Sequence, residues 1–144
     1  MVRVRPLEVD DGDALAGIDV EHAGRAGHDP VATRGALSFY ARTGHAFVAE
    51  DGAGPRGFAL AQAVWDGTRP TVQLQTLATA EADAEARAAL LEAVTKSAYD
   101  AAVYDLVARA PHGDPALHDL LDREGWRAEP VALLRRTLGS RGAS

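Results

Sequence analysis

Hydrophobic and polar residues follow two different periods along this chain, and each period predicts a different kind of element. Near the start, Val2 and Val4 alternate with arginines, a period of two that is typical of a short strand. Leu15, Ile18 and His22 then recur at spacings of three and four, which predicts a helix ending near residue 24. The same periods, with the turn signals between them, predict a second helix over 30–44, strands over 45–50, 56–65, 71–78 and 103–110, helices over 82–99 and 115–124, and a last extended segment, a short hairpin, over 126–138.

The connections between these segments indicate how the strands pair. The turns over 51–55 and 66–70 are too short for a crossover, so the three strands that they join are expected to form an antiparallel meander. Asp29 is expected to cap the second helix, with Pro30 in its first turn. The helix over 82–99 permits a parallel pairing of the strand that follows it. The sequence therefore predicts an α/β (α+β) fold with a mixed central sheet, helices on both faces and the order β-α-α-β-β-β-α-β-α-β(β).

The length of the chain argues for a single domain. It has 144 residues, close to the roughly 150 that one domain takes. Hydrophobic residues make up 47% and charged residues 25%, which is the balance of a folded globular chain and not of a disordered one. No linker rich in proline, glycine or serine divides the sequence, and no segment repeats. We expect one domain over 1–138 and a flexible tail over 139–144.

Charge and cysteine content exclude several classes of function. The net charge of −6 argues against a general surface for nucleic acid or for an anionic membrane. The absence of cysteine excludes disulfides, thiolate metal sites and a cysteine nucleophile. The first residues lack the apolar core of a signal peptide and no apolar run is as long as a membrane span, so a cytoplasmic protein is expected. The histidines lack the spacing of a metal-binding motif, and no metal site is expected.

Two stretches of the sequence, together with the order of the elements, resemble the Gcn5-related N-acetyltransferase (GNAT) superfamily. The run RPLEVDDGDAL over 5–15 is similar to the arginine-proline pair and acidic helix entry with which the family begins. The run LLDREGW over 120–126 is similar to its late helix and glycine-aromatic step. The resemblance covers nearly the whole chain. It implies an enzyme that transfers an acetyl group from acetyl-CoA to a small amine or a protein N-terminus.

The resemblance also implies where acetyl-CoA would bind. In the family, the pantetheine arm pairs with the backbone of the fourth strand, which corresponds here to 73–78. The pyrophosphate lies on amides at the start of the following helix, because a helix N-terminus favours anions and glycine permits their close approach. The positions that the resemblance assigns to the cofactor are Leu77, Ala78, Thr79, Ala82, Glu85, Arg87 and Asp114.

The helix start that should receive the pyrophosphate departs from the family pattern. The segment 79–87 contains no glycine, and it places Glu81, Asp83 and Glu85 where the pyrophosphate would lie. Carboxylates in the first turn of a helix interact favourably with the helix dipole, so the segment is also explained as an ordinary helix start. Two hypotheses follow: a CoA-dependent N-acetyltransferase with a divergent loop, or a GNAT-like protein that has lost CoA binding and serves as a ligand- or protein-binding module. A third is a protein that forms a homodimer.

Candidates for catalytic side chains are few. The tyrosine that acts as the acid in many family members corresponds to Leu121 here, and His118 is the nearest group able to protonate a leaving thiolate. His118 is also explained as a partly exposed helix histidine, and Asp114 as a helix cap. Gln73 and Gln75 alternate along the fourth strand, where they either position an amine or its water or form ordinary cross-strand hydrogen bonds.

Overall fold

The sheet at the centre of the molecule has the order β1-β2-β3-β4-β5, and it confirms the predicted mixed topology. The structure is a computed structural model in which residues 1–139 are described. Neighbouring strands are antiparallel from the first to the fourth, and the fifth is parallel to the fourth. The strands are β1 (Arg3–Pro6), β2 (Phe47–Asp51), β3 (Gly54–Trp65), β4 (Pro70–Thr79) and β5 (Leu106–Ala108).

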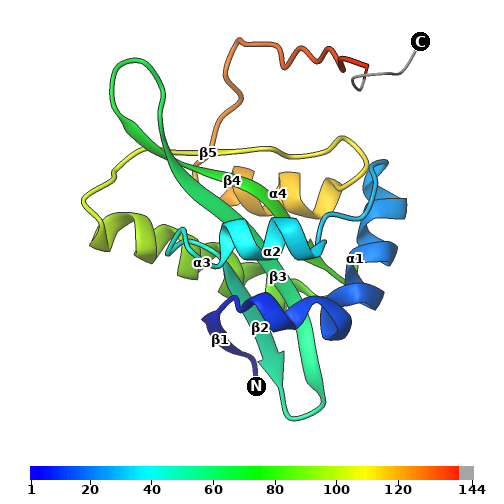
Figure 1. The fold of residues 1–144 in the computed structure, drawn as a ribbon. Helices are drawn as coiled ribbons and strands as arrows, with labels where there is room; N and C mark the ends of the chain where they lie inside the picture. Colours follow the sequence, from blue (N-terminus) through cyan, green and yellow to red (C-terminus); the bar gives the residue numbers. More distant parts are fainter. Residues whose placement is uncertain (140–144) are drawn as a thin grey trace.

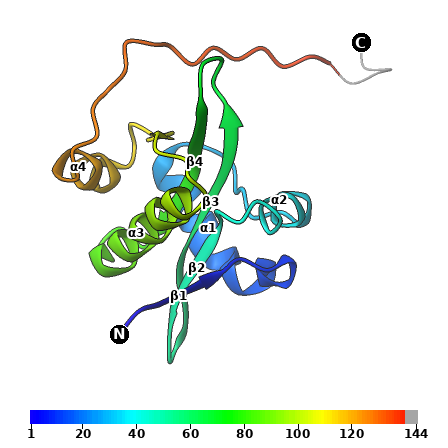
Figure 2. The same cartoon turned by 90° about the vertical axis from the view of Figure 1, so that its left-hand side faces the viewer.

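Helices cover both faces of this sheet, as the sequence predicts (Figures 1 and 2). They are α1 (Gly12–Ala26), which follows the short 3-10 turn η1 (Val9–Asp11), α2 (Arg34–Tyr40), α3 (Ala84–Asp100) and α4 (Pro115–Arg123). Leu15 of α1 and Leu37 of α2 pack with Phe58 on one face, whereas Leu90 of α3 and Leu117 of α4 pack on the other. Each face of the sheet therefore has its own hydrophobic core. None of the helices in residues 1–139 is long and apolar enough to cross a membrane.

The second helix begins later than the sequence pattern predicts, so the expected cap at Asp29 is wrong. Helix α2 starts at Arg34, with Thr33 as its N-cap. The buried carboxylate of Asp19 in α1 accepts hydrogen bonds from the N–H groups of residues 31 and 32, at 2.9 and 2.8 Å. Because these amides have their partners in α1, the chain after Asp29 continues as a loop fixed against that helix.

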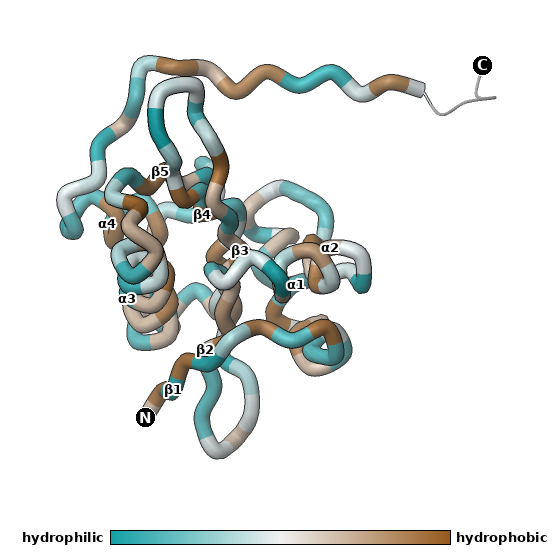
Figure 3. Tube along the Cα trace, turned by 60° about the vertical axis from the view of Figure 1, so that its left-hand side comes forward, coloured by the Kyte–Doolittle hydropathy of each residue, from teal (hydrophilic) through white to brown (hydrophobic). Residues whose placement is uncertain are grey.

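The predicted hairpin over 126–138 is also wrong. After α4 the chain has no regular element up to residue 139, and it continues as an exposed segment of mixed hydropathy (Figures 1 and 3). The pairs Leu133-Leu134 and Arg135-Arg136 break the period of two that a half-buried strand needs. The neighbouring strand, β5, is also shorter than predicted and offers only three residues of edge. Of the predicted tail over 139–144, residues 140–144 lie outside the described residues.

Candidate functional site

Strands β4 and β5 separate partway along β4. The parallel pairing extends only from Val72 to Leu74, and the N–H of Arg109 donates a last hydrogen bond to the carbonyl oxygen of Leu74 at 2.9 Å. Beyond this point, residues 75–79 of β4 have no strand partner on the β5 side among residues 1–139. This part of β4 therefore presents strand-edge backbone groups to the space between the two strands.

A β-bulge in β4 lies at the point of separation. Leu60 of β3 pairs with Thr76 and Ala61 pairs with Leu74, so Gln75 is an extra residue in the register. A bulge bends its strand and increases the local twist, which turns the end of β4 away from β5. A cleft of about 780 Å³ lies here, bordered by the end of α1 and the loop that follows it, by the bulge, by the loop between β5 and α4, and by alternate residues of the C-terminal segment.

The two glutamines that the sequence singles out contact each other beside this cleft. Both are half-buried, and the Gln73 side-chain amide donates a hydrogen bond to Oε1 of Gln75 at 3.2 Å. Gln75 lines the cleft together with Leu77, whereas Gln73 does not. The side chains of Leu77 and Ala78 are packed in the two opposite cores, so chiefly the backbone groups of these residues are available to a ligand.

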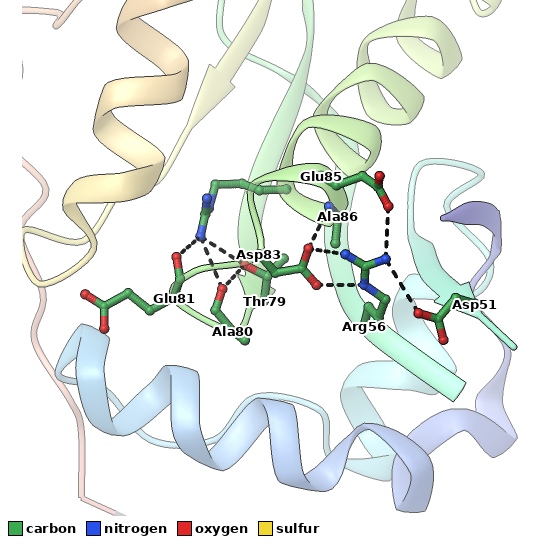
Figure 4. Close-up of polar contacts among 9 residues, drawn as sticks. Asp51, Arg56, Thr79, Ala80, Glu81, Asp83, Glu85 and Ala86 are labelled. Atoms are coloured by element: carbon green, nitrogen blue, oxygen red, sulfur yellow. Dashed lines mark hydrogen bonds and ion pairs between the residues drawn. The ribbon is translucent and has the colours of Figure 1, made fainter. Parts of the chain in front are cut away.

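The start of α3 holds its own carboxylates in place (Figure 4). Asp83, the N-cap, accepts a hydrogen bond from the N–H of Ala86 at 3.1 Å. Arg56 reaches across from β3 and donates from Nε to Asp83 at 2.9 Å and from Nη1 to Glu85 at 2.9 Å. The hydrogen bond from Arg56 is the main cause that holds the pKa of Asp83 below its ordinary value. Asp83 is therefore ionised and paired with Arg56 at neutral pH.

Arg87 fills the other side of the same loop. Arg87 as a whole is 6% exposed, and its Nη2 donates to the carbonyl oxygens of Ala80 and Glu81 at 3.2 and 2.7 Å. The same nitrogen donates to the Thr79 hydroxyl at 3.3 Å, so Arg87 links α3 to the end of β4. Its charge is directed into the chain and not outward to an anion.

This helix start does not fit the pyrophosphate of CoA as the resemblance requires. Four of the amides around the helix start already donate within the chain, and the loop has no glycine that would let a phosphate approach. Three carboxylates, those of Asp51, Asp83 and Glu85, share the cation of Arg56, which leaves local negative charge. The amides of Asp83 and Ala84 donate to the carbonyl oxygens of Ala80 and Ala82. The amides of Ala86 and Arg87 donate to the side chain and to the carbonyl oxygen of Asp83.

His118, the candidate acid, does not line the cleft. It is exposed on α4, and its Nε2 donates to the carbonyl oxygens of Ala110 and Pro111 at 3.1 and 3.0 Å. Its ring stacks on that of His112, with the centroids 6.2 Å apart. These contacts fix the loop between β5 and α4. No group of three or more His, Asp or Glu side chains within residues 1–139 is arranged to hold a metal ion.

Asp114 occupies the N-cap position of α4, as expected, and its carboxylate also reaches α1. The residue is 3% exposed, and its carboxylate contacts Nε2 of His22 in α1 at 3.1 Å. Gly113 permits this approach of the two helices, because a Cβ there would lie 2.5 Å from the carbonyl oxygen of Arg25. Burial by itself raises the pKa of Asp114, but the hydrogen bond and the charge of His22 outweigh it and hold that pKa below its ordinary value.

Sequence reasoning missed two residues that organise this region. His22 shares the helical spacing of Leu15 and Ile18, and an ionisable group at such a core position needs a polar partner. That signal was present in the sequence, although the partner lies 92 residues away. Arg56 gave no local signal, because the carboxylates that pair with it, Asp83 and Glu85, lie at the start of α3.

Comparisons with known proteins place the chain in a family. A family model described as a protein of unknown function (DUF1999) matches residues 2–141. The crystal structure of wild-type TTHA1254 from Thermus thermophilus is 44% identical over 96% of this chain and 99% of that one, with a TM-score of 0.76. A search of curated proteins finds no match.

Solved acetyltransferases share the fold at low sequence identity. Ribosomal-protein-alanine N-acetyltransferase from Brucella melitensis biovar Abortus 2308 is 14% identical over 96% of this chain and 100% of that one, with a TM-score of 0.74. Aminoglycoside N-acetyltransferase AAC(6')-Iy, solved with CoA, is 14% identical over 95% of each chain, with a TM-score of 0.73. At these identities the likeness shows the fold alone. The chain thus belongs to the DUF1999 family, and its fold is that of the GNAT superfamily.

Proposed function

We propose that this protein binds a small molecule in the cleft beside the β4 bulge and that it does so without CoA held at the start of α3. One observation carries the proposal. Asp83 occupies the helix N-terminus through the N–H of Ala86 and is itself held by Arg56. The position that an anion would take is thereby filled by the chain's own carboxylate, whereas the cleft beside Gln75 has the volume of a small-molecule site.

Thermal unfolding with and without acetyl-CoA tests this proposal. A ligand at 100 times its Kd stabilises a protein by about 2.7 kcal/mol, which a melting curve detects readily. We expect millimolar acetyl-CoA to leave the Tm unchanged, because the carboxylate of Asp83 occupies the start of α3 and repels an anion. A clear rise in Tm would contradict the proposal.

A double variant, Asp83→Gly with Glu85→Gly, tests whether these carboxylates prevent acetyl-CoA from binding. It removes both carboxylates and frees the amide of Ala86, so we expect it to gain acetyl-CoA binding that calorimetry can measure. The matched control is Asp119→Asn with Asp122→Asn on the exposed side of α4, which changes the net charge equally and should gain none. If the double variant binds no better than the control, the carboxylates are not the obstacle.

An N-acyltransferase is the second candidate function, and a separate observation favours it. The unpaired edge of β4 over 75–79 is what the backbone pairing of a pantetheine arm requires, and solved acetyltransferases share the fold. The acceptor would be a small amine or a protein N-terminus. A thiol reagent would detect the CoA released from acetyl-CoA in the presence of amines, without background because the chain has no cysteine. Thiol release that depends on an amine would favour this candidate over the first.

A further inference from the structure

We infer that the cleft beside the β4 bulge binds a carboxylate of its ligand through the side chains of Arg109 and Gln75, and that Arg135 binds a second carboxylate of the same molecule. The ligand class is therefore a small dicarboxylic acid. This inference rests on the proposed binding function and names the chemistry of its ligand.

The side chain of Arg109 lies on the face of the sheet that carries α1. Leu106 and Ala108 pack against the core under α3 and α4, and successive side chains of a strand point to opposite faces. The N–H of Arg109 still donates to the carbonyl oxygen of Leu74, so the alternation extends to this residue. Val107, which shares its face, is 42% exposed, so this part of the face is open to solvent. Arg109 is half-buried and lines the cleft.

Gln75 lies beside Arg109 on the same face and offers hydrogen-bond donors. Gln73 is opposite Val107 in the parallel register, and Gln75 and Arg109 each follow two positions later on their strands. Oε1 of Gln75 already accepts a hydrogen bond from Gln73, whereas its Nε2 makes no hydrogen bond within residues 1–139. A side-chain amide whose oxygen is occupied has two N–H groups left to donate. The two neighbouring side chains are therefore both donors, which suits a ligand group that only accepts.

The charges around the cleft point to an anion, although the whole protein has a net charge of −6. Arg109 and Arg135 both line the cleft, and neither forms an ion pair within residues 1–139. Asp29 is the single acidic side chain among the described residues on the cleft border. A cleft lined by unpaired positive charge raises the local concentration of anions.

The arrangement of the donors favours carboxylates. A guanidinium binds a carboxylate through two parallel hydrogen bonds, and the remaining lone pairs of the carboxylate accept from a neighbouring amide. Arg109 follows β5 and Arg135 belongs to the C-terminal segment, so the two cations come from different borders of the cleft. Two single charges on different borders match two separate carboxylates better than one doubly charged phosphate group.

Calorimetry with glutarate tests the inference, because glutarate carries two carboxylates and no other polar group. Pentanoate has the same chain length with one carboxylate, and pentanediol has none. We expect glutarate to bind about tenfold more tightly than pentanoate, and pentanediol not to bind, since each carboxylate contributes charge-assisted hydrogen bonds. Inorganic phosphate is the competing anion, and tighter binding of phosphate than of glutarate would overturn the assignment to carboxylates.

Variants assign the contacts. Arg109→Gln should weaken glutarate binding about tenfold, and Arg109→Lys, which keeps the charge but not the parallel hydrogen bonds, should give an intermediate affinity. Gln75→Glu replaces the donor amide by a negative charge and should also weaken binding. Arg135→Gln should lower the affinity for glutarate to that for pentanoate. Arg123→Gln, exposed on α4 and away from the cleft, is the control and should bind as the unaltered protein does.

The outcomes separate this inference from the proposed function. No binding of glutarate, equal binding of glutarate by Arg109→Gln and the unaltered protein, or equal binding of pentanediol and glutarate would each overturn the inference. A rise in Tm with acetyl-CoA would instead contradict the proposed function, in which Asp83 fills the start of α3. Weakened glutarate binding by Arg109→Gln, with Arg123→Gln unchanged, would support the carboxylate site in either case.

Discussion

Two polar clusters flank β4, and they differ in whether every group has a partner. At the end of the strand, the carboxylate of Asp83 is paired with Arg56 and with the amide of Ala86, so it occupies the helix start itself. Beside the bulge, His22 and Asp114 pair with each other, and the other ring nitrogen of His22 is buried without a partner among residues 1–139. The two ends of one strand therefore differ in how completely the side-chain polar groups packed against them are satisfied.

The strongest test of this difference is Asp114→Ala. The substitution leaves the buried ring of His22 without its partner, so both ring nitrogens are then unsatisfied. Removing one member of a buried pair costs about 3 kcal/mol, and we expect a loss of that size in the free energy of unfolding measured with urea. Asp119→Ala, on the exposed side of the same helix, should change the stability by less than about 0.5 kcal/mol. A loss below about 1 kcal/mol for Asp114→Ala would show that the pair contributes little.

The free energy of unfolding at acid pH gives a second test of the pair formed by His22 and Asp114. Because the pKa of Asp114 is lowered on folding, the stability that it contributes is complete above the ordinary carboxyl pKa of about 4 and is lost as the pH falls through the lowered value. The unaltered protein should therefore lose stability more steeply below about pH 4 than Asp114→Asn does. Equal slopes would mean that Asp114 titrates alike in the folded and unfolded chains.

Substitutions in the cluster of Asp83 and Arg56 should lower the stability by less. Asp83→Ala removes the N-cap of α3, which typically costs about 1 kcal/mol. Asp83→Ser keeps an oxygen for the amide of Ala86 but gives up the ion pair with Arg56, and partly exposed ion pairs contribute little. We therefore expect the serine variant to retain most of the stability when the two are compared by urea unfolding. If both variants lose the same amount, the ion pair and not the cap stabilises this helix start.

The fold was predictable from the sequence because its elements carry local signals. Helix α3 was expected over 82–99 and spans Ala84–Asp100, because its apolar spacing and its acidic first turn lie within one segment. The loop before α2 was not predictable, since Asp19, more than ten residues earlier, takes up the amides that would have begun the helix. The C-terminal segment was mistaken for a hairpin because apolar content alone does not make a strand.

The candidate site was predictable only in part. Gln75 and the end of β4 follow from the resemblance, and the structure adds the bulge that separates β4 from β5. The contact of His22 with Asp114 joins residues 92 positions apart, and no periodicity in one segment reports a contact of that kind. Arg56 and Asp83 pair across 27 positions for the same reason. Local pattern fixes elements, whereas the pairing of charges depends on how the elements pack.

The smallest effect on stability is expected in the C-terminal segment. Leu134 is 88% exposed, so Leu134→Ser should change the free energy of unfolding by less than about 0.5 kcal/mol. Arg135→Gln should leave the stability equally unchanged, because Arg135 is also exposed. Urea unfolding of the two variants measures both changes. A loss above about 1 kcal/mol for Leu134→Ser would mean that this segment packs on its own sheet or on a second copy, and the size of the protein in solution would decide between the two.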